Sequence, residues 1–69
     1  MESRKDRFTR LASRRTNDII ERIRILGNCS NKSTYEYTEE EVNKIFRAID
    51  REIKASKAKF SSSKKKFTL

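Results

Sequence analysis

Arginine and lysine residues near the two ends of the chain are the side chains whose type and spacing best suit a defined chemistry. Residues 1–15 carry six bases and two acids, and residues 54–69 carry six bases and no acid. Guanidinium and ammonium groups donate hydrogen bonds to phosphate oxygens, and the planar guanidinium fork can bind two of those oxygens at once. Basic clusters of this kind are typical of polyanion-binding proteins.

Spacing along a helix brings several of these bases to one side. Arg7, Arg10 and Arg14 project within about 60° of one another at about 100° per residue. Our predicted nucleic-acid contacts are the following bases from the two stretches: Arg7, Arg10, Arg14, Arg15, Lys54, Lys57, Lys59, Lys64, Lys65 and Lys66.

A second basic row, formed by Lys44, Arg47, Arg51 and Lys54, lies nearer the middle of the sequence. It has two interpretations. It could contact phosphates, or it could be an ordinary solvated face with ion pairs from Glu40 to Lys44 and from Asp50 to Lys54, four residues apart. For this row taken alone we favour the solvated face.

The polar segment between residues 28 and 37 supplies a second group of candidate contacts. Asn28, Asn31, Lys32 and Tyr35 combine hydrogen-bonding groups with an aromatic ring, as suits unpaired bases or a protein surface. Tyr37 is expected to pack structurally, and Tyr35 suits either role. The single cysteine, Cys29, is interpreted as a small, partly buried apolar residue.

Catalytic and metal-binding patterns are not found in the sequence. It has no histidine, no glycine-rich phosphate loop and no metal-ligand spacing. We therefore expect no enzyme, no cofactor, no metal and no small-molecule substrate. Because no apolar run approaches about 20 residues, we also expect no membrane partner and a cytoplasmic location.

Two amphipathic helices are predicted to position these residues. Apolar residues from Phe8 to Leu26 recur every three or four positions, which predicts a helix over residues 3–26. Gly27, the only glycine, is expected to end it in a left-handed cap. The second helix, predicted from Glu39 to Lys59, begins at a capping box formed by Thr38 and Glu41.

The apolar stripe of the second helix follows a heptad-like spacing of four and three residues. Its members are Val42, Phe46, Ile49, Ile53, Ser56 and Phe60. Two such helices joined by a ten-residue connector, Asn28 to Tyr37, predict an all-α fold with an antiparallel two-helix hairpin. The hairpin spans residues 1–60, and residues 61–69 are expected to form a disordered, flexible basic tail.

The predicted hairpin brings the two charged stretches together. Residues 1–15 have a net charge of +4, residues 54–69 of +6, and the remainder of −2. We call the combined stretches 1–15 and 54–69 the basic pole. A chain of 69 residues has little core of its own. We therefore expect the hairpin to self-associate into a bundle or to dock on a larger partner.

Three segments of the sequence resemble a pattern shared by short bacterial and mobile-element proteins that have no assigned function. They are Arg14-Arg15-Thr16-Asn17, the stretch Ile23 to Asn31, and Tyr35-Glu36-Tyr37-Thr38-Glu39-Glu40. The shared pattern consists of a basic helix, an LGN-x-SN loop, a YxYT helix start and a final Lys/Phe segment. The likeness covers roughly residues 8–60 and implies no activity and no functional residue.

These observations predict a non-enzymatic protein that binds nucleic acid, RNA or DNA, or a ribonucleoprotein through its basic pole. The alternative is a protein-docking modulator from a mobile element that presses the pole against an acidic protein surface. A third interpretation is a structural homo-oligomer, in which self-association is the main role of the apolar stripes.

Overall fold

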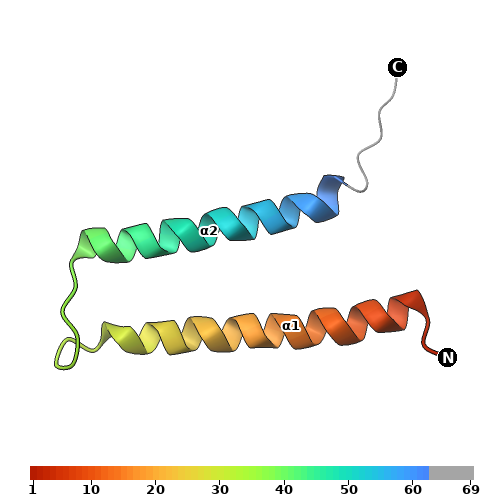
Figure 1. Ribbon diagram of the computed structural model, residues 1–69, viewed down its shortest axis with the longest axis horizontal. Helices are drawn as coiled ribbons and strands as arrows, with labels where there is room; N and C mark the ends of the chain where they lie inside the picture. Colours follow the sequence, from red (N-terminus) through yellow and green to blue (C-terminus); the bar gives the residue numbers. More distant parts are fainter. Residues whose placement is uncertain (63–69) are drawn as a thin grey trace, which may run out of the picture. The chain divides into compact units, whose positions relative to one another are not determined.

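The computed structural model describes residues 1–62 of the chain. These residues form α1 (Arg4–Gly27), the short 3-10 helix η1 (Asn28–Ser30) and α2 (Glu39–Ser62), with no strand among them (Figure 1). The all-helical prediction is confirmed. The chain divides into two units, residues 1–36 and the segment that begins at Tyr37.

Helix α1 begins at a serine cap that the sequence prediction placed inside the helix. The Asp6 backbone N–H donates to Ser3 Oγ at 3.0 Å, and the Arg7 N–H donates to the Ser3 carbonyl oxygen at 2.9 Å. Ser3 itself is extended, with φ −76° and ψ 167°. Its side chain therefore satisfies one of the free donors of the first turn, and the carboxylate of Asp6 suits the positive end of the helix dipole.

Helix α1 ends at Gly27, one residue beyond the predicted bound, but the predicted left-handed cap is wrong. Gly27 has φ −58° and ψ −27°, which is right-handed, and Asn28 continues at φ −67°. The Asn28 backbone N–H donates to the carbonyl oxygens of Ile25 and Leu26. The chain tightens into the 3-10 turn η1, so the carbonyl oxygens of Ile25 and Leu26 are satisfied without a positive φ.

This conformation predicts the effect of replacing Gly27. A Cβ added there meets no heavy atom within 4 Å. Because glycine in a right-handed helix costs about 0.5 to 1 kcal/mol relative to alanine, Gly27→Ala should raise the free energy of unfolding by about that amount. Thermal melting followed by circular dichroism measures it. Gly27→Asn is the control: asparagine tolerates a left-handed cap better than alanine, so a more stable Asn variant would contradict the observed conformation.

The connector is organised by Asn31. Its Oδ1 accepts from the Ser33 backbone N–H at 3.0 Å and from the Ser33 hydroxyl at 2.6 Å. Its carbonyl oxygen accepts from the N–H groups of Thr34 and Tyr35 at 3.1 and 2.9 Å. An asparagine side chain that bonds two residues ahead is an Asx turn, so Asn31 supplies the hydrogen bonds that a regular helix or strand does not provide here.

Helix α2 begins at the predicted capping box. The Glu41 N–H donates to Thr38 Oγ1 at 3.1 Å, and the Thr38 N–H donates to Glu41 Oε1 at 2.8 Å. Tyr37 and Val42, which occupy the two positions of a hydrophobic staple, are both half-buried. The three glutamates of the first turn complement the positive end of the helix dipole.

Helix α2 ends at Ser62, three residues beyond the predicted bound at Lys59. Ser61 and Ser62, which the sequence analysis assigned to the tail, are therefore helical. Serine has a moderate helix propensity and does not by itself end a helix. The remainder of the predicted tail, residues 63–69, lies outside the described residues.

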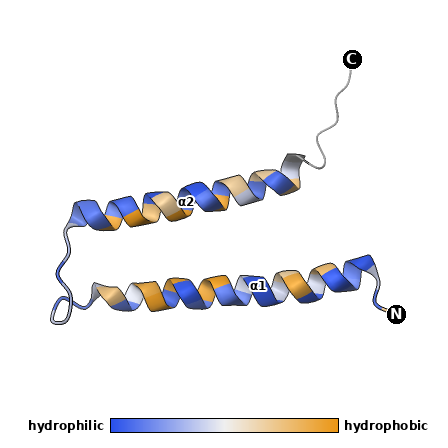
Figure 2. Ribbon diagram, viewed as in Figure 1, coloured by the Kyte–Doolittle hydropathy of each residue, from blue (hydrophilic) through white to orange (hydrophobic). Residues whose placement is uncertain are grey.

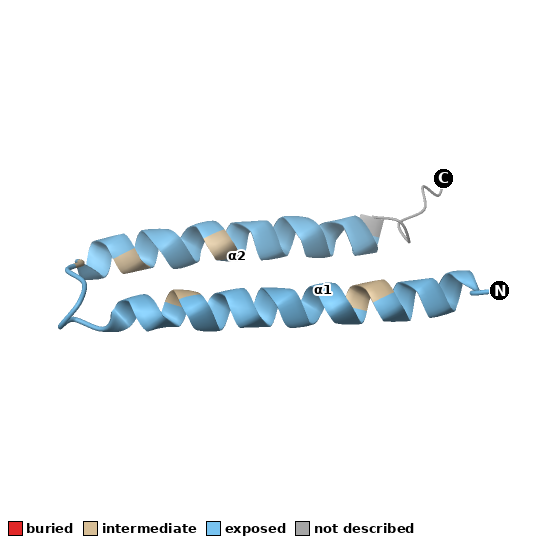
Figure 3. Cartoon of the chain, turned by 60° about the horizontal axis from the view of Figure 1, so that its bottom comes forward, coloured by how far each residue is buried: buried red, intermediate tan, exposed pale blue. Residues whose placement is uncertain are grey.

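Hydrophobic residues recur along both helices (Figure 2), yet no residue between 1 and 61 is buried (Figure 3). The half-buried residues are Leu11, Ala12, Leu26, Tyr37, Val42 and Ile49. Large side chains on the stripes stay open to solvent, for example Ile19 at 57% and Ile53 at 51%. Cys29 is exposed, so the predicted partial burial of that residue is wrong. No helix in the described part of the chain is long and apolar enough to cross a membrane.

Candidate nucleic-acid interface

The first half of α1 carries four of the predicted contact residues: Arg7, Arg10, Arg14 and Arg15. All four are exposed. Within residues 1–62, Arg7, Arg14 and Arg15 make no ion pair, whereas Arg10 does. The guanidinium groups of Arg7, Arg14 and Arg15 therefore present free donors on the surface of α1. Nearby, the Lys5 ammonium nitrogen lies 5.8 Å from the centroid of the Phe8 ring, within the range of a cation–π interaction.

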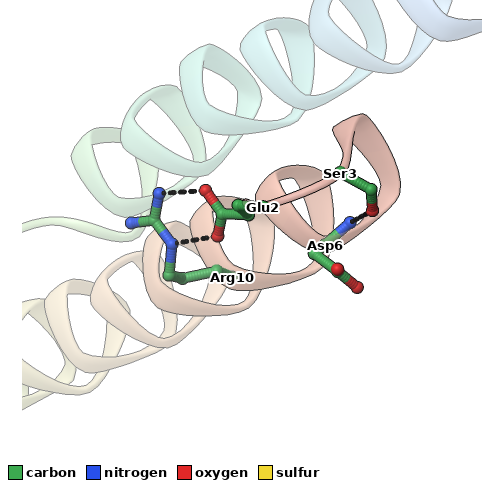
Figure 4. Close-up of polar contacts among 4 residues, drawn as sticks. All are labelled: Glu2, Ser3, Asp6 and Arg10. Atoms are coloured by element: carbon green, nitrogen blue, oxygen red, sulfur yellow. Dashed lines mark hydrogen bonds and ion pairs between the residues drawn. The ribbon is translucent and has the colours of Figure 1, made fainter.

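Arg10 is already paired with Glu2. Its Nε lies 2.7 Å from one carboxylate oxygen of Glu2 and its Nη2 lies 3.0 Å from the other, a two-point contact (Figure 4). Glu2 precedes the Ser3 cap, so the chain before α1 folds along the first turns of the helix to make this pair. The predicted phosphate contact at Arg10 is thus partly satisfied within the chain.

The pair shifts both ionisations. The hydrogen bond from Arg10 lowers the pKa of Glu2 and raises the pKa of Arg10. A carboxyl group with a lowered pKa in the folded chain adds stability at every pH above its pKa in the unfolded chain. The contact between Glu2 and Arg10 should therefore persist at neutral pH. It should weaken as pH falls through the lowered pKa of Glu2. Both groups are exposed, so the contribution to stability is small.

The pKa shift gives a direct prediction for Arg10→Gln. The substitution removes the charge that favours the Glu2 carboxylate, so the pKa of Glu2 should rise to the ordinary glutamate value. NMR titration of the Glu2 side-chain carbonyl carbon measures this. Arg14→Gln removes the same charge one turn further on and should leave the titration of Glu2 unchanged. An equal response to both substitutions would show that general charge, and not this contact, sets the pKa.

The basic row of α2 is open to solvent. Lys44, Arg47, Arg51 and Lys54 are all exposed. The ion pairs predicted from Glu40 to Lys44 and from Asp50 to Lys54 are not formed among residues 1–62. Exposed side chains four residues apart gain little from pairing and lose rotamer freedom by it. The row is therefore a set of exposed cations without the two predicted ion pairs, and the choice between a solvated face and a phosphate contact stays a prediction.

Part of this row surrounds a surface hollow. Arg47, Asp50, Arg51 and Lys54 line an open space of about 300 Å³ on α2. The other predicted contacts on this helix, Lys57 and Lys59, follow Lys54 toward its C-terminal end. Lys64, Lys65 and Lys66 lie outside the described residues.

The connector residues predicted as contacts differ in how far contacts within the chain already occupy them. Asn28 caps α1 through its backbone, and the Oδ1 of Asn31 is held in the Asx turn. Lys32 is exposed and already makes an interaction within the chain. Tyr35 is 50% exposed, so its ring remains accessible for stacking. Of the four, Tyr35 has the most freedom to contact a ligand.

Two features of this surface were missed by sequence reasoning. The Glu2–Arg10 contact joins residues eight apart across a helix start, a spacing that no helical periodicity predicts. The hollow beside Asp50 depends on where the side chains point, although the row itself follows from residue spacing. The serine cap of α1 could have been found, because Ser3 followed three residues later by an acid, Asp6, matches a helix-start pattern.

Among the described residues, no group of three or more His, Cys, Asp or Glu side chains comes together in a way that could hold a metal ion. In comparisons with known proteins, no family model, no curated protein and no solved structure matches this chain. The likeness to short mobile-element proteins stays a prediction.

Proposed function

We propose that the chain is a non-enzymatic nucleic-acid or ribonucleoprotein-binding protein that contacts phosphates through its basic pole. The observation that carries this proposal is that predicted contact residues in the described part of the chain are exposed and unpaired. Arg7, Arg14, Arg15, Lys54 and Lys57 are exposed and, within residues 1–62, make no ion pair. Free cations at this density create a field that attracts a polyphosphate, and binding releases the counterions condensed on it.

The proposal includes an antiparallel packing of α1 and α2. Each helix has 24 residues, so the two apolar stripes have matching lengths. Each stripe remains exposed in its own unit, and burying it removes apolar surface from water at about 25 cal/mol per Å². In this arrangement the first half of α1 lies beside the last half of α2, which assembles the basic pole.

We further propose that two hairpins pair into a helical bundle. Ile20, Ile25 and Ile45 flank the main stripes and are 43%, 53% and 43% exposed. A second copy would cover these flanks, as the facing helices of a four-helix bundle cover one another. The tail lysines Lys64, Lys65 and Lys66 would then extend the grip along a phosphate backbone.

A capture experiment separates this proposal from docking on an acidic protein. The tagged chain is used to isolate partners from its native host, in nuclease-treated and untreated halves. Loss of the captured partners after nuclease treatment is the expected result, because phosphates hold them. Partners that survive the treatment unchanged would favour the protein-docking modulator and count against nucleic-acid binding.

A further inference from the structure

The hollow on α2 combines three cations with one carboxylate. Arg47, Arg51 and Lys54 supply donors, and Asp50 supplies acceptors, around a space of about 300 Å³. All four residues come from a single helix within two turns, so the geometry of α2 alone sets their spacing.

Within the described residues 1–62, none of these four side chains makes a hydrogen bond or an ion pair with another residue. Among residues 1–62, Asp50 forms no ion pair with Lys54, four residues on, or with either arginine. The donors and the acceptors of the hollow are therefore all available to a ligand. This differs from Arg10, whose donors already bind Glu2.

Most of the hollow stays accessible when α2 packs. At about 100° per residue, Arg47, Arg51 and Lys54 project about 80° to 140° from Phe46 and further from Ile49 and Ile53, whereas Asp50 projects only about 40° from Phe46, at the edge of the apolar stripe. A partner that covers the stripe, whether α1 or a second copy, leaves the three cations in solvent and Asp50 at the border of the covered surface.

The carboxylate narrows the choice of ligand. Arginine forks match phosphate oxygens, but a phosphate alone gains nothing from Asp50 and is repelled by it. A ligand that suits all four residues carries a hydroxyl donor close to a phosphate. The ribose 2′-hydroxyl of RNA is such a donor, and DNA lacks it.

We propose that the hollow binds one phosphate and the neighbouring 2′-hydroxyl of an RNA strand. Arg47, Arg51 and Lys54 contact the phosphate oxygens, and Asp50 accepts the hydrogen bond of the hydroxyl. This inference rests on the proposed nucleic-acid binding and deepens it, because it names RNA as the preferred ligand and α2 as the element that selects it.

The test compares a single-stranded oligoribonucleotide with the deoxyribonucleotide of matching sequence, each labelled and titrated with the full chain by fluorescence anisotropy. The wild-type chain should prefer RNA by about tenfold, the scale of one hydrogen bond to a charged group. Asp50→Ala should bring the ratio close to one. The variant should bind RNA more weakly because the contact to the 2′-hydroxyl is lost. It should bind DNA more tightly because the charge that repels the phosphate is removed.

A second set of variants tests the phosphate contact. Arg51→Gln should weaken RNA binding at least about threefold more than Arg22→Gln, the same substitution at an exposed arginine of α1, and more than Lys44→Gln, which lies in the row but not at the hollow. Alanine and glutamine are good helix formers, so each variant should keep its helix content, which circular dichroism checks.

The outcomes separate the two proposals. Binding of RNA and DNA with equal affinity by the wild-type chain, or an RNA-to-DNA ratio unchanged by Asp50→Ala, would overturn the hollow as an RNA site and leave nucleic-acid binding standing. Equal losses from Arg51→Gln, Arg22→Gln and Lys44→Gln would overturn its phosphate contact. A wild-type chain that binds neither oligonucleotide would overturn both proposals.

Discussion

Raising the salt concentration from roughly 50 to roughly 200 mM should weaken the binding of this chain to nonspecific RNA or DNA at least about tenfold. The physical reason is counterion release. Each phosphate neutralised by a lysine or arginine frees condensed cations, so the logarithm of the affinity falls linearly with the logarithm of the salt concentration. A tenfold loss over this range requires only about two phosphate contacts, fewer than the unpaired cations of the basic pole supply.

A matched pair of variants assigns this salt dependence to the pole. Arg14→Gln/Arg15→Gln removes two cations from the pole, and Arg22→Gln/Arg24→Gln removes two arginines from the same helix outside it. The first pair should make the salt slope shallower by about 1.4 to 1.8, since each contact contributes about 0.7 to 0.9. The second pair should change the slope much less, because Arg24 already pairs with Glu21 at 3.7 Å.

Two results would contradict the pole as the contact surface. An affinity of the wild-type chain that does not change with salt concentration would show that phosphates are not its ligand. Equal slopes for the two double variants would mean that the cations act only through net charge. Circular dichroism should show the same helix content in both variants, because arginine and glutamine have similar helix propensities.

Phe46→Ala/Ile53→Ala should abolish cooperative unfolding of the chain. Both side chains lie on the apolar stripe of α2 and are 45% and 51% exposed in the structure. If the stripe is buried by packing, each truncation costs about 2 to 5 kcal/mol. A chain of this length has a total stability of only about 3 to 5 kcal/mol. The double variant should therefore melt without a sigmoidal transition.

The opposite face of α2 provides the control for this variant. Lys44→Ala/Arg51→Ala removes two long side chains from the basic row and should leave the melting transition in place. Melting the wild-type chain at two concentrations then identifies what covers the stripe. A transition temperature that rises with concentration indicates pairing with a second copy, and one that does not indicates packing within the chain. An unchanged transition in Phe46→Ala/Ile53→Ala would show that the stripe is not a packing face.

The start of α2 could be predicted because its causes are local. The Thr38 and Glu41 side chains bond each other's backbone N–H groups across three residues, and no other part of the chain is needed. The apolar periodicity of both helices is likewise visible in the residues themselves. The far end of α2 was harder to predict, because the serines at 61 and 62 favour neither continuation nor an end strongly.

Part of the candidate site could also be predicted from the sequence, and part could not. The positions of the arginines and lysines on each helix follow from their spacing, and so does the basic row from Lys44 to Lys54. Whether the row is paired does not follow from spacing: the ion pair from Asp50 to Lys54 was expected and is not formed. A surface ion pair is nearly neutral in free energy, so helical spacing permits it without enforcing it.

The order of residues alone determined which stretches are helical, where α2 begins and which side of each helix is apolar or basic, because each of these depends on neighbours within about one turn. Three features were decided only in three dimensions: the right-handed Gly27, the Glu2–Arg10 contact and the hollow beside Asp50. They depend on how the chain turns before and after a helix and on which rotamers its exposed side chains adopt. Residue type and spacing leave several such arrangements close in energy, and the folded chain selects one.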